Sequence, residues 1–203
     1  MKNNWRLFWN EKQNRNLFFI SVGGLAIVLF FFLFFLTWNE NRIGYTFNDP
    51  VLNLVGPVDV SIAAFIVTYG LSLAGIIQGI QTPMIFLRLL RVYGLITILR
   101  MISLYLLPLQ PPRDIIPLQD PLLKFSFYSG RENLKDLFYS GHTAILLVFA
   151  FVFPERKLKI IFVLGAVAVG TLVVLQHVHY SIDVLAAPVF VWIAVKIERR
   201  LIK

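Results

Sequence analysis

The sequence predicts an all-α membrane protein with six transmembrane helices and both termini in the cytoplasm. Of its 203 residues, 58% are hydrophobic, and the mean hydropathy is +0.73. Residues 17–38 form a run of 22 positions without a charged side chain, which is long enough to cross about 30 Å of hydrocarbon. Basic side chains recur at alternate ends of the apolar segments, as the positive-inside rule predicts for a polytopic protein.

Six apolar segments are expected to form the spans of a single six-helix membrane domain that covers residues 1–203. They lie at residues 17–38, 60–78, 83–107, 140–153, 158–176 and 182–195. The first segment is too long for a signal-peptide core and no small-residue cleavage site follows it, so we expect an uncleaved span. Cysteine is absent, which excludes disulfides and thiolate chemistry.

The net charge of +8 follows the alternation of the spans and does not indicate a nucleic-acid partner. The segments assigned to the cytoplasm hold 13 basic and three acidic side chains, whereas the opposite loops and span ends hold six basic and eight acidic ones. We therefore place both termini in the cytoplasm and expect the basic faces to contact anionic lipid.

All three histidines fall on the predicted outer side of the membrane. His177 and His179 lie in "QHVHYSID", between the last two spans, and His142 lies in "DLFYSGHTA", at the start of the fourth span. Because residues four apart share one face of a helix, Asp183 can hold the ring of His179. The second ring nitrogen is then available as a nucleophile or base.

The start of the fourth span is also suited to an anion. Ser140 and Gly141 precede a helix whose first turn has unpaired N–H groups, and such a terminus favours phosphate. Residues 141–153 span roughly 20 Å and residues 179–195 roughly 25 Å at 1.5 Å per residue, both less than the ~30 Å hydrocarbon layer. We therefore expect the histidines near the phosphate level of the outer leaflet.

Two motifs contain the histidines. The chain reads D-x-x-x-S-G-H-T over residues 136–143 and H-Y-S-I-D-V over residues 179–184. They resemble the catalytic motifs of the sphingomyelin synthase branch of the type 2 phosphatidic acid phosphatase superfamily, and residues 100–111 give a weaker match. The phosphatase motif K-x6-R-P is missing, Tyr139 replaces the proline of P-S-G-H, and Val173 stands at the arginine position of the third phosphatase motif. These departures favour the synthase-like branch.

The resemblance implies catalysis through a phosphohistidine on the outer leaflet, with no cofactor and no metal. His179, oriented by Asp183, would attack phosphorus, and His142 would act as the general acid and then as the general base. An arginine inside a span indicates function by default, so Arg100 is the first candidate to hold the phosphate. The remaining candidates are phosphate-binding or supporting residues: Ser140, Gly141, Tyr139, Tyr180 and Arg113 for the phosphate, and Asp136 and His177 in support.

Each candidate also has a simpler interpretation. His179 and Asp183 can form a structural clasp at a helix end, and the H-x-H pair with Asp183 can bind zinc. His142 can serve a helix start without chemistry, and Asp136 can orient His142 or solvate its loop. Arg100 can extend to the membrane interface, where tyrosines are common.

Three classes of function remain at this point. The first is a lipid phosphotransferase that moves a phospho-headgroup from a glycerophospholipid to ceramide or diacylglycerol. The second is a lipid phosphate phosphatase or phospholipase C-type hydrolase that uses water, and the third is a non-enzymatic transporter or scaffold. Membrane lipids are the expected substrate and acceptor, and the sequence contains no signal for an oligomeric state. The short chain without targeting signals fits a bacterial inner membrane, with a site that faces the periplasm, the exterior or a lumen.

Overall fold

The computed structural model describes residues 2–118 and 133–201, and nearly all regular structure within these ranges is helical. Besides the helices, the described residues form one isolated bridge, between Tyr45 and Leu109. The helical elements are α1 Lys2–Asn10, α2 Lys12–Glu40, η1 Leu52–Leu54, α3 Ser61–Ile80, α4 Pro83–Leu106, α6 Gly141–Val152, α7 Arg156–Leu175 and α8 Ser181–Leu201.

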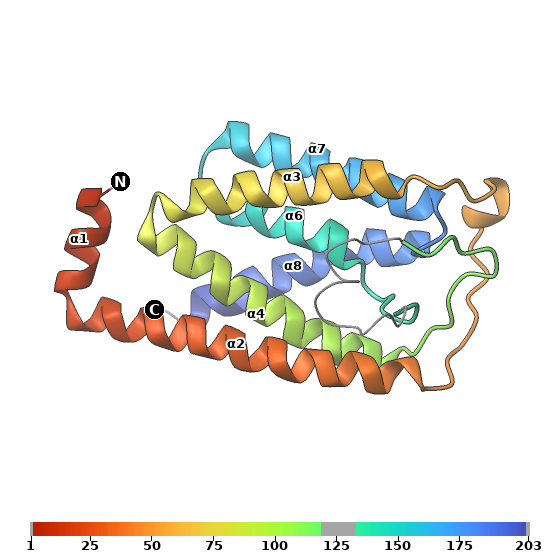
Figure 1. The fold of residues 1–203 in the computed structure, drawn as a ribbon, viewed down its shortest axis with the longest axis horizontal. Coiled ribbons are helices and arrows are strands. Elements are labelled where there is room, and N and C mark those ends of the chain that lie inside the picture. Colours follow the sequence, from red (N-terminus) through yellow and green to blue (C-terminus); the bar gives the residue numbers. More distant parts are fainter. Residues whose placement is uncertain (1, 119–132, 202–203) are drawn as a thin grey trace.

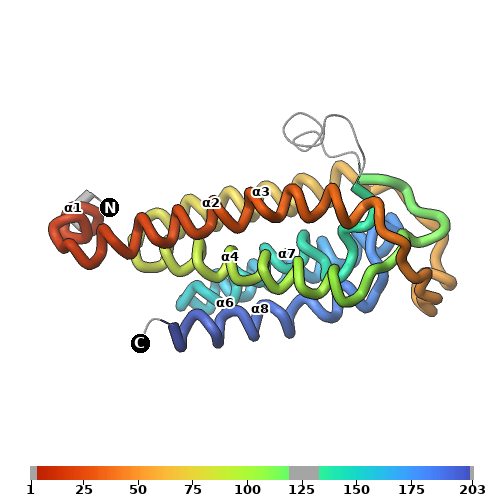
Figure 2. Tube along the Cα trace, turned by 90° about the horizontal axis from the view of Figure 1, so that it is seen from below, coloured from red at the N-terminus to blue at the C-terminus, as the bar shows by residue number. Residues whose placement is uncertain are grey.

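Helices α2, α3, α4, α6, α7 and α8 lie side by side and alternate in direction along the chain (Figure 1). Figures 1 and 2 agree that both chain ends lie at one end of the bundle, together with the α3–α4 and α6–α7 connections. The start of α6, the α7–α8 turn and η1 lie at the opposite end. Below, these are called the terminal end and the site end.

The prediction of a helical membrane protein is confirmed, and each of the six apolar segments forms a helix. In the described parts of the chain, α2, α3 and α7 are long and apolar enough to cross a membrane, with mean hydropathies of 2.8, 1.7 and 2.6. Helix α6 has only 12 residues, α4 contains three arginines, and α8 ends in a charged turn. Six spans and cytoplasmic termini therefore stay predictions.

Helix α6 occupies the core of the bundle and carries the first histidine motif at its start. It is apolar on nearly all sides and packs against α7, α8 and α4, which is typical of a helix that neighbours shield from the surroundings. Ser140 provides its N-cap, and the helix ends because Phe153 is extended ahead of Pro154. The shortness of α6 thus follows from local sequence signals at both of its ends.

A further helix, α1, precedes the first apolar segment, outside the six segments that the sequence predicted to be helical. The Nε1 atom of Trp5 donates to the carbonyl oxygen of Ile80 at 2.7 Å, and the side chain of Phe8 is buried. Aromatic contacts between Trp5 and Phe86 continue this docking onto the start of α4. The N-terminal segment is therefore packed against the terminal end of the bundle.

Candidate active site

His179 and Asp183 form a buried pair at the site end of the bundle. Their residues are 2% and 0% exposed, and Nδ1 of His179 lies 3.2 Å from Oδ2 of Asp183. The same Oδ2 accepts a hydrogen bond from the backbone N–H of Tyr180 at 3.0 Å, as a carboxylate in the first turn of a helix commonly does. This geometry orients the imidazole through Nδ1 and leaves Nε2 for chemistry.

His142 lies opposite this pair, on the first turn of α6. The ring centroids of His142 and His179 are 6.3 Å apart, and the ring planes meet at 68°. His142 is partly exposed, whereas His179 is buried. Two helix starts, those of α6 and α8, therefore bring the two imidazoles together with Asp183 behind one of them.

His177 shapes the turn that carries His179. It ends α7 in the left-handed conformation, with a φ of 56°, and the N–H of Val178 then donates to the carbonyl of Val173 at 3.0 Å. This is the Schellman pattern of a helix C-terminus, with histidine where glycine is common. The Nε2 atom of His177 lies 2.8 Å from the carbonyl oxygen of Val55. These contacts fit the predicted supporting role.

Ser140 joins the first turns of α6 and α8. Its residue is fully buried, and its N–H donates to the backbone carbonyl of Asp183 at 3.0 Å. Its Oγ accepts hydrogen bonds from the N–H and the hydroxyl of Thr143, at 3.5 and 3.2 Å. Ser140 therefore acts as an N-cap and as a link between the two motifs, since both of its polar groups have protein partners.

The side chain of Arg100, on α4, extends to the first turn of α6. Its Nε donates to Oδ1 of Asp136 at 2.8 Å, its Nη2 donates to the carbonyl of Asp136 at 3.0 Å, and its Nη1 donates to the carbonyl of Tyr139. A Cβ atom on Gly141 would lie 3.0 Å from Nη1 of Arg100, so the glycine leaves room for the guanidinium. Arg100 thus lies where a phosphate cradle is predicted, and Asp136 is its ion-pair partner.

Three other phosphate candidates have no such position. The hydroxyl of Tyr139 donates to the carbonyl of Ile96 at 2.6 Å, and that of Tyr180 donates to the carbonyl of Gln110 at 2.9 Å. Arg113 is exposed in its loop. We therefore leave these three residues out of the phosphate site.

Asp49 is a residue of this region that the sequence did not single out. It is 2% exposed, and its two carboxylate oxygens accept hydrogen bonds from the N–H of Ser181 at 2.6 Å and from its hydroxyl at 3.0 Å. Burial raises the pKa of Asp49, but the hydrogen bonds from Ser181 and Val51 outweigh it, so the pKa lies below its ordinary value. Caps normally come from the residue next to the helix, so local spacing gives no signal for this one.

The zinc alternative for the H-x-H pair has no ligand set in the part of the chain that the structure describes. No three His, Cys, Asp or Glu side chains there lie close enough together to hold a metal ion. The contact of the His177 ring with the Val55 carbonyl accounts for one of the two imidazoles.

Comparison with known families supports the assignment of the C-terminal part of the chain. Residues 135–199, about the last third of the chain, match the family model "PAP2 superfamily C-terminal". The matched range includes His142, His179 and Asp183. No curated protein matches the chain. The match supports the predicted type 2 phosphatidic acid phosphatase superfamily, whose members are phosphatases and phosphotransferases that act on lipids. It thereby supports an enzyme of phosphoryl transfer or hydrolysis with membrane lipids as partners.

Proposed function

We propose that this chain is an integral-membrane lipid phosphotransferase of the sphingomyelin synthase or phosphosphingolipid synthase type. It moves a phospho-headgroup between lipids through a phosphohistidine on the outer leaflet. The observation that supports this best is the opposition of His142 and His179 at 6.3 Å between ring centroids, with Asp183 bound to Nδ1 of His179. If His179 and Asp183 only stabilised the start of a helix, they would not need the imidazole of His142 beside them.

In the first step, Nε2 of His179 attacks the phosphorus of the donor lipid. The new N–P bond forms as the P–O bond to the lipid alcohol breaks, and His142 gives its proton to the departing oxygen. Asp183 holds the Nδ1 proton and stabilises the positive charge that develops on the imidazole. Such general acid catalysis typically contributes about 10²- to 10⁴-fold.

In the second step, the acceptor alcohol replaces the departed one. His142, now neutral, takes the proton of the acceptor hydroxyl as its oxygen attacks phosphorus, and the P–N bond to His179 breaks. Both catalytic groups return to their starting protonation states. The cycle is therefore balanced without a further reactant.

The phosphate is expected to lie over the first turn of α6. Gly141 and His142 present N–H groups at a helix start, where the macrodipole favours an anion. The guanidinium of Arg100 lies directly behind Gly141, and it has five N–H donors, of which three serve Asp136 and Tyr139. We assign to Arg100 both the bracing of this turn and a share of the charge stabilisation.

A hydrolase that uses water is the second candidate, because the family match supports phosphatases and transferases equally. We further propose six spans with the site end facing the periplasm, the exterior or a lumen, because the terminal end carries the basic excess.

The test determines which product receives the phosphate of the donor lipid. Purified protein in liposomes is given phosphatidylcholine or phosphatidylethanolamine, with and without ceramide or diacylglycerol, and the products are identified by mass spectrometry. We expect a new phospholipid that requires both the acceptor and His179, and an acid-labile phosphoprotein that is lost in His179→Ala.

Asp59→Asn is the matched control, because Asp59 is an exposed loop residue at the same end of the bundle. Release of phosphate or phospho-headgroup that ignores the acceptor would instead establish the hydrolase. Equal product from the wild type and His179→Ala over the whole lipid panel would refute catalysis by this histidine.

A further inference from the structure

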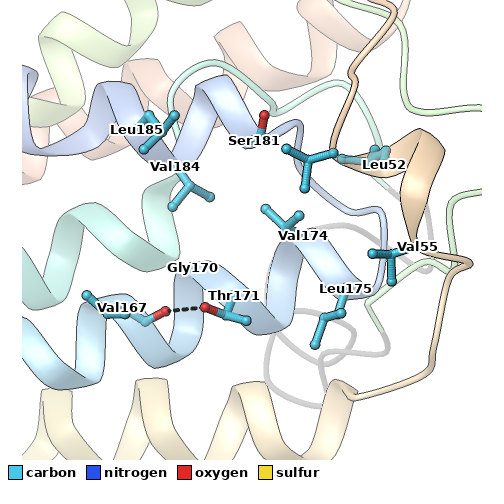
Figure 3. Close-up of a pocket in the computed structure, with 11 residues that line it drawn as sticks. Leu52, Val55, Val167, Gly170, Thr171, Val174, Leu175, Ser181, Val184 and Leu185 are labelled. Carbon is cyan, nitrogen blue, oxygen red and sulfur yellow. Dashed lines mark hydrogen bonds between the residues drawn. The ribbon is translucent and has the colours of Figure 1, made fainter.

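An apolar groove of about 460 Å³ lies between α7 and α8 at the site end and is not used by the chemistry above. Figure 3 shows its walls, with the segment around η1 closing one end. The residues that matter here are Val167, Thr171 and Val174 of α7, Ser181 and Leu185 of α8, and Leu52 of η1.

The two hydroxyl groups that line the groove already make hydrogen bonds within the protein. The hydroxyl of Thr171 donates to the carbonyl of Val167 at 2.9 Å, and that of Ser181 donates to Asp49 at 3.0 Å. The other lining side chains are aliphatic, and no charged group is among them. A polar ligand would lose its water contacts here without replacement, so the lining selects a hydrocarbon.

The position of the groove indicates where that hydrocarbon comes from. Its α7 wall belongs to a helix that is apolar enough to cross a membrane, and Val167 and Leu185 at its edge are 61% and 72% exposed. The groove is thus continuous with the face that the helices present to a bilayer. Its volume falls within the range of about 300–1,000 Å³ that small-molecule sites occupy.

The groove also adjoins the histidine site. Gly170, which lines the groove on α7, packs closely against the side that faces the histidines. A Cβ atom at this position would lie 2.6 Å from Val184 Cγ1 and 3.4 Å from the hydroxyl oxygen of Thr143. Thr143 follows His142 directly, and Ser181 is two residues after His179. One layer of side chains therefore separates the groove from the reacting groups.

We infer that this groove binds one hydrocarbon chain of the lipid whose phosphate reacts at His179, an assignment that rests on the proposed function. Residues 49–55 connect the two sites. Asp49 holds Ser181, the Val55 carbonyl holds His177, and Val51, Leu52 and Val55 line the groove between these contacts. A bound chain therefore touches the segment that fixes the catalytic turn, and this makes the groove a determinant of chain specificity.

The experiment uses phosphatidylethanolamine, one of the proposed donor lipids, with a diazirine in one acyl chain as the probe, in liposomes that contain the protein. After illumination, mass spectrometry maps the labelled residues. We expect saturable labelling of Val174, Leu185 and Leu52 that excess unlabelled phosphatidylethanolamine suppresses. Labelling that rises linearly with the probe and covers the lipid-facing surface evenly would overturn the inference.

A pair of tryptophan variants adds the control. Val174→Trp fills the middle of the groove, whereas Val163→Trp adds the same side chain to a 41%-exposed position of α7 outside it. Because the indole fills the volume that the hydrocarbon chain would occupy, we expect groove labelling to be lost in Val174→Trp and to stay at the wild-type level in Val163→Trp. Equal groove labelling in both variants would contradict the assignment. The labelling map of the wild-type protein tests the assignment separately, because it does not depend on whether Val174→Trp folds.

His179→Ala separates this inference from the proposed function. Chain binding does not need the nucleophile, so groove labelling should persist in His179→Ala while turnover is lost. Saturable groove labelling in a wild type that turns over no lipid would refute the proposed function and leave a lipid site. Turnover without groove labelling would refute the groove assignment alone.

Discussion

The two ends of α8 each hold a buried carboxylate, but their partners differ in kind. Asp183, in the first turn, is 0% exposed and meets the imidazole of His179 and a backbone N–H. Glu198, in the last turn, is 4% exposed and meets two guanidinium groups of α4, at 3.1 Å from Arg88 and 2.8 Å from Arg91. One carboxylate faces an imidazole, whose ring nitrogens can donate or accept a proton, and the other faces two guanidinium groups, which only donate hydrogen bonds.

This difference separates a chemical role from a structural one. The carboxylate of Glu198 lies between two arginines and joins α4 to α8 through an ion-pair network. At the other end, Oδ1 of Asp183 is buried without a hydrogen-bond partner among the described residues. Among the same residues, Nη2 of Arg88 and Nη1 of Arg91 are also buried without a partner, so the contrast between the two ends lies in the kind of partner that each carboxylate meets.

The largest effect is expected for Asp183→Asn. The amide keeps one oxygen that can accept a hydrogen bond, but it has no negative charge. It therefore cannot stabilise the imidazolium that forms when His179 attacks phosphorus. We expect the turnover number to fall by about 10²- to 10⁴-fold, measured on the lipid product in liposomes. Thermal unfolding in the same detergent should change little, and a turnover number close to that of the wild type would contradict the proposed role.

Glu198→Gln should affect stability instead of chemistry. It leaves two arginines facing each other without a carboxylate, and breaking a buried ion pair typically costs about 3–5 kcal/mol. We expect a loss near the lower limit, since the arginine side chains keep 25% and 15% exposure. Denaturant unfolding measures it, with the exposed Glu155→Gln as control. Turnover per folded molecule should stay at the wild-type level, and a specific loss of turnover would remove the contrast between the two ends.

Asp49→Asn tests the carboxylate that holds the start of α8. Loss of a helix cap typically costs about 1 kcal/mol. Because the pKa of Asp49 is lowered in the folded protein, its contribution is present above the ordinary value of 3.8 and is lost as the pH falls below it. Unfolding measured between pH 3 and 7 should therefore show a steeper acid loss in the wild type than in Asp49→Asn. Parallel pH profiles would exclude this contribution.

Local patterns in the sequence determined the helices and the core of the site. Apolar runs predict helices because burial or membrane insertion acts on each segment by itself, and six predicted segments form helices. The contact between His179 and Asp183 follows from their spacing of four residues at a helix start. The cap at Ser140 is equally local, because its partner is Thr143.

Only the tertiary structure decided which distant groups meet. Arg100 pairs with Asp136 across 36 positions, Glu198 with Arg88 across 110, and Asp49 with Ser181 across 132. The same holds for the hydroxyl of Tyr180, which bonds the carbonyl of Gln110. The groove likewise exists only because η1 folds over α7 and α8. Hydropathy and helical periodicity describe neighbours within a few turns, whereas these contacts depend on how whole helices pack, and packing is a property of the assembled bundle.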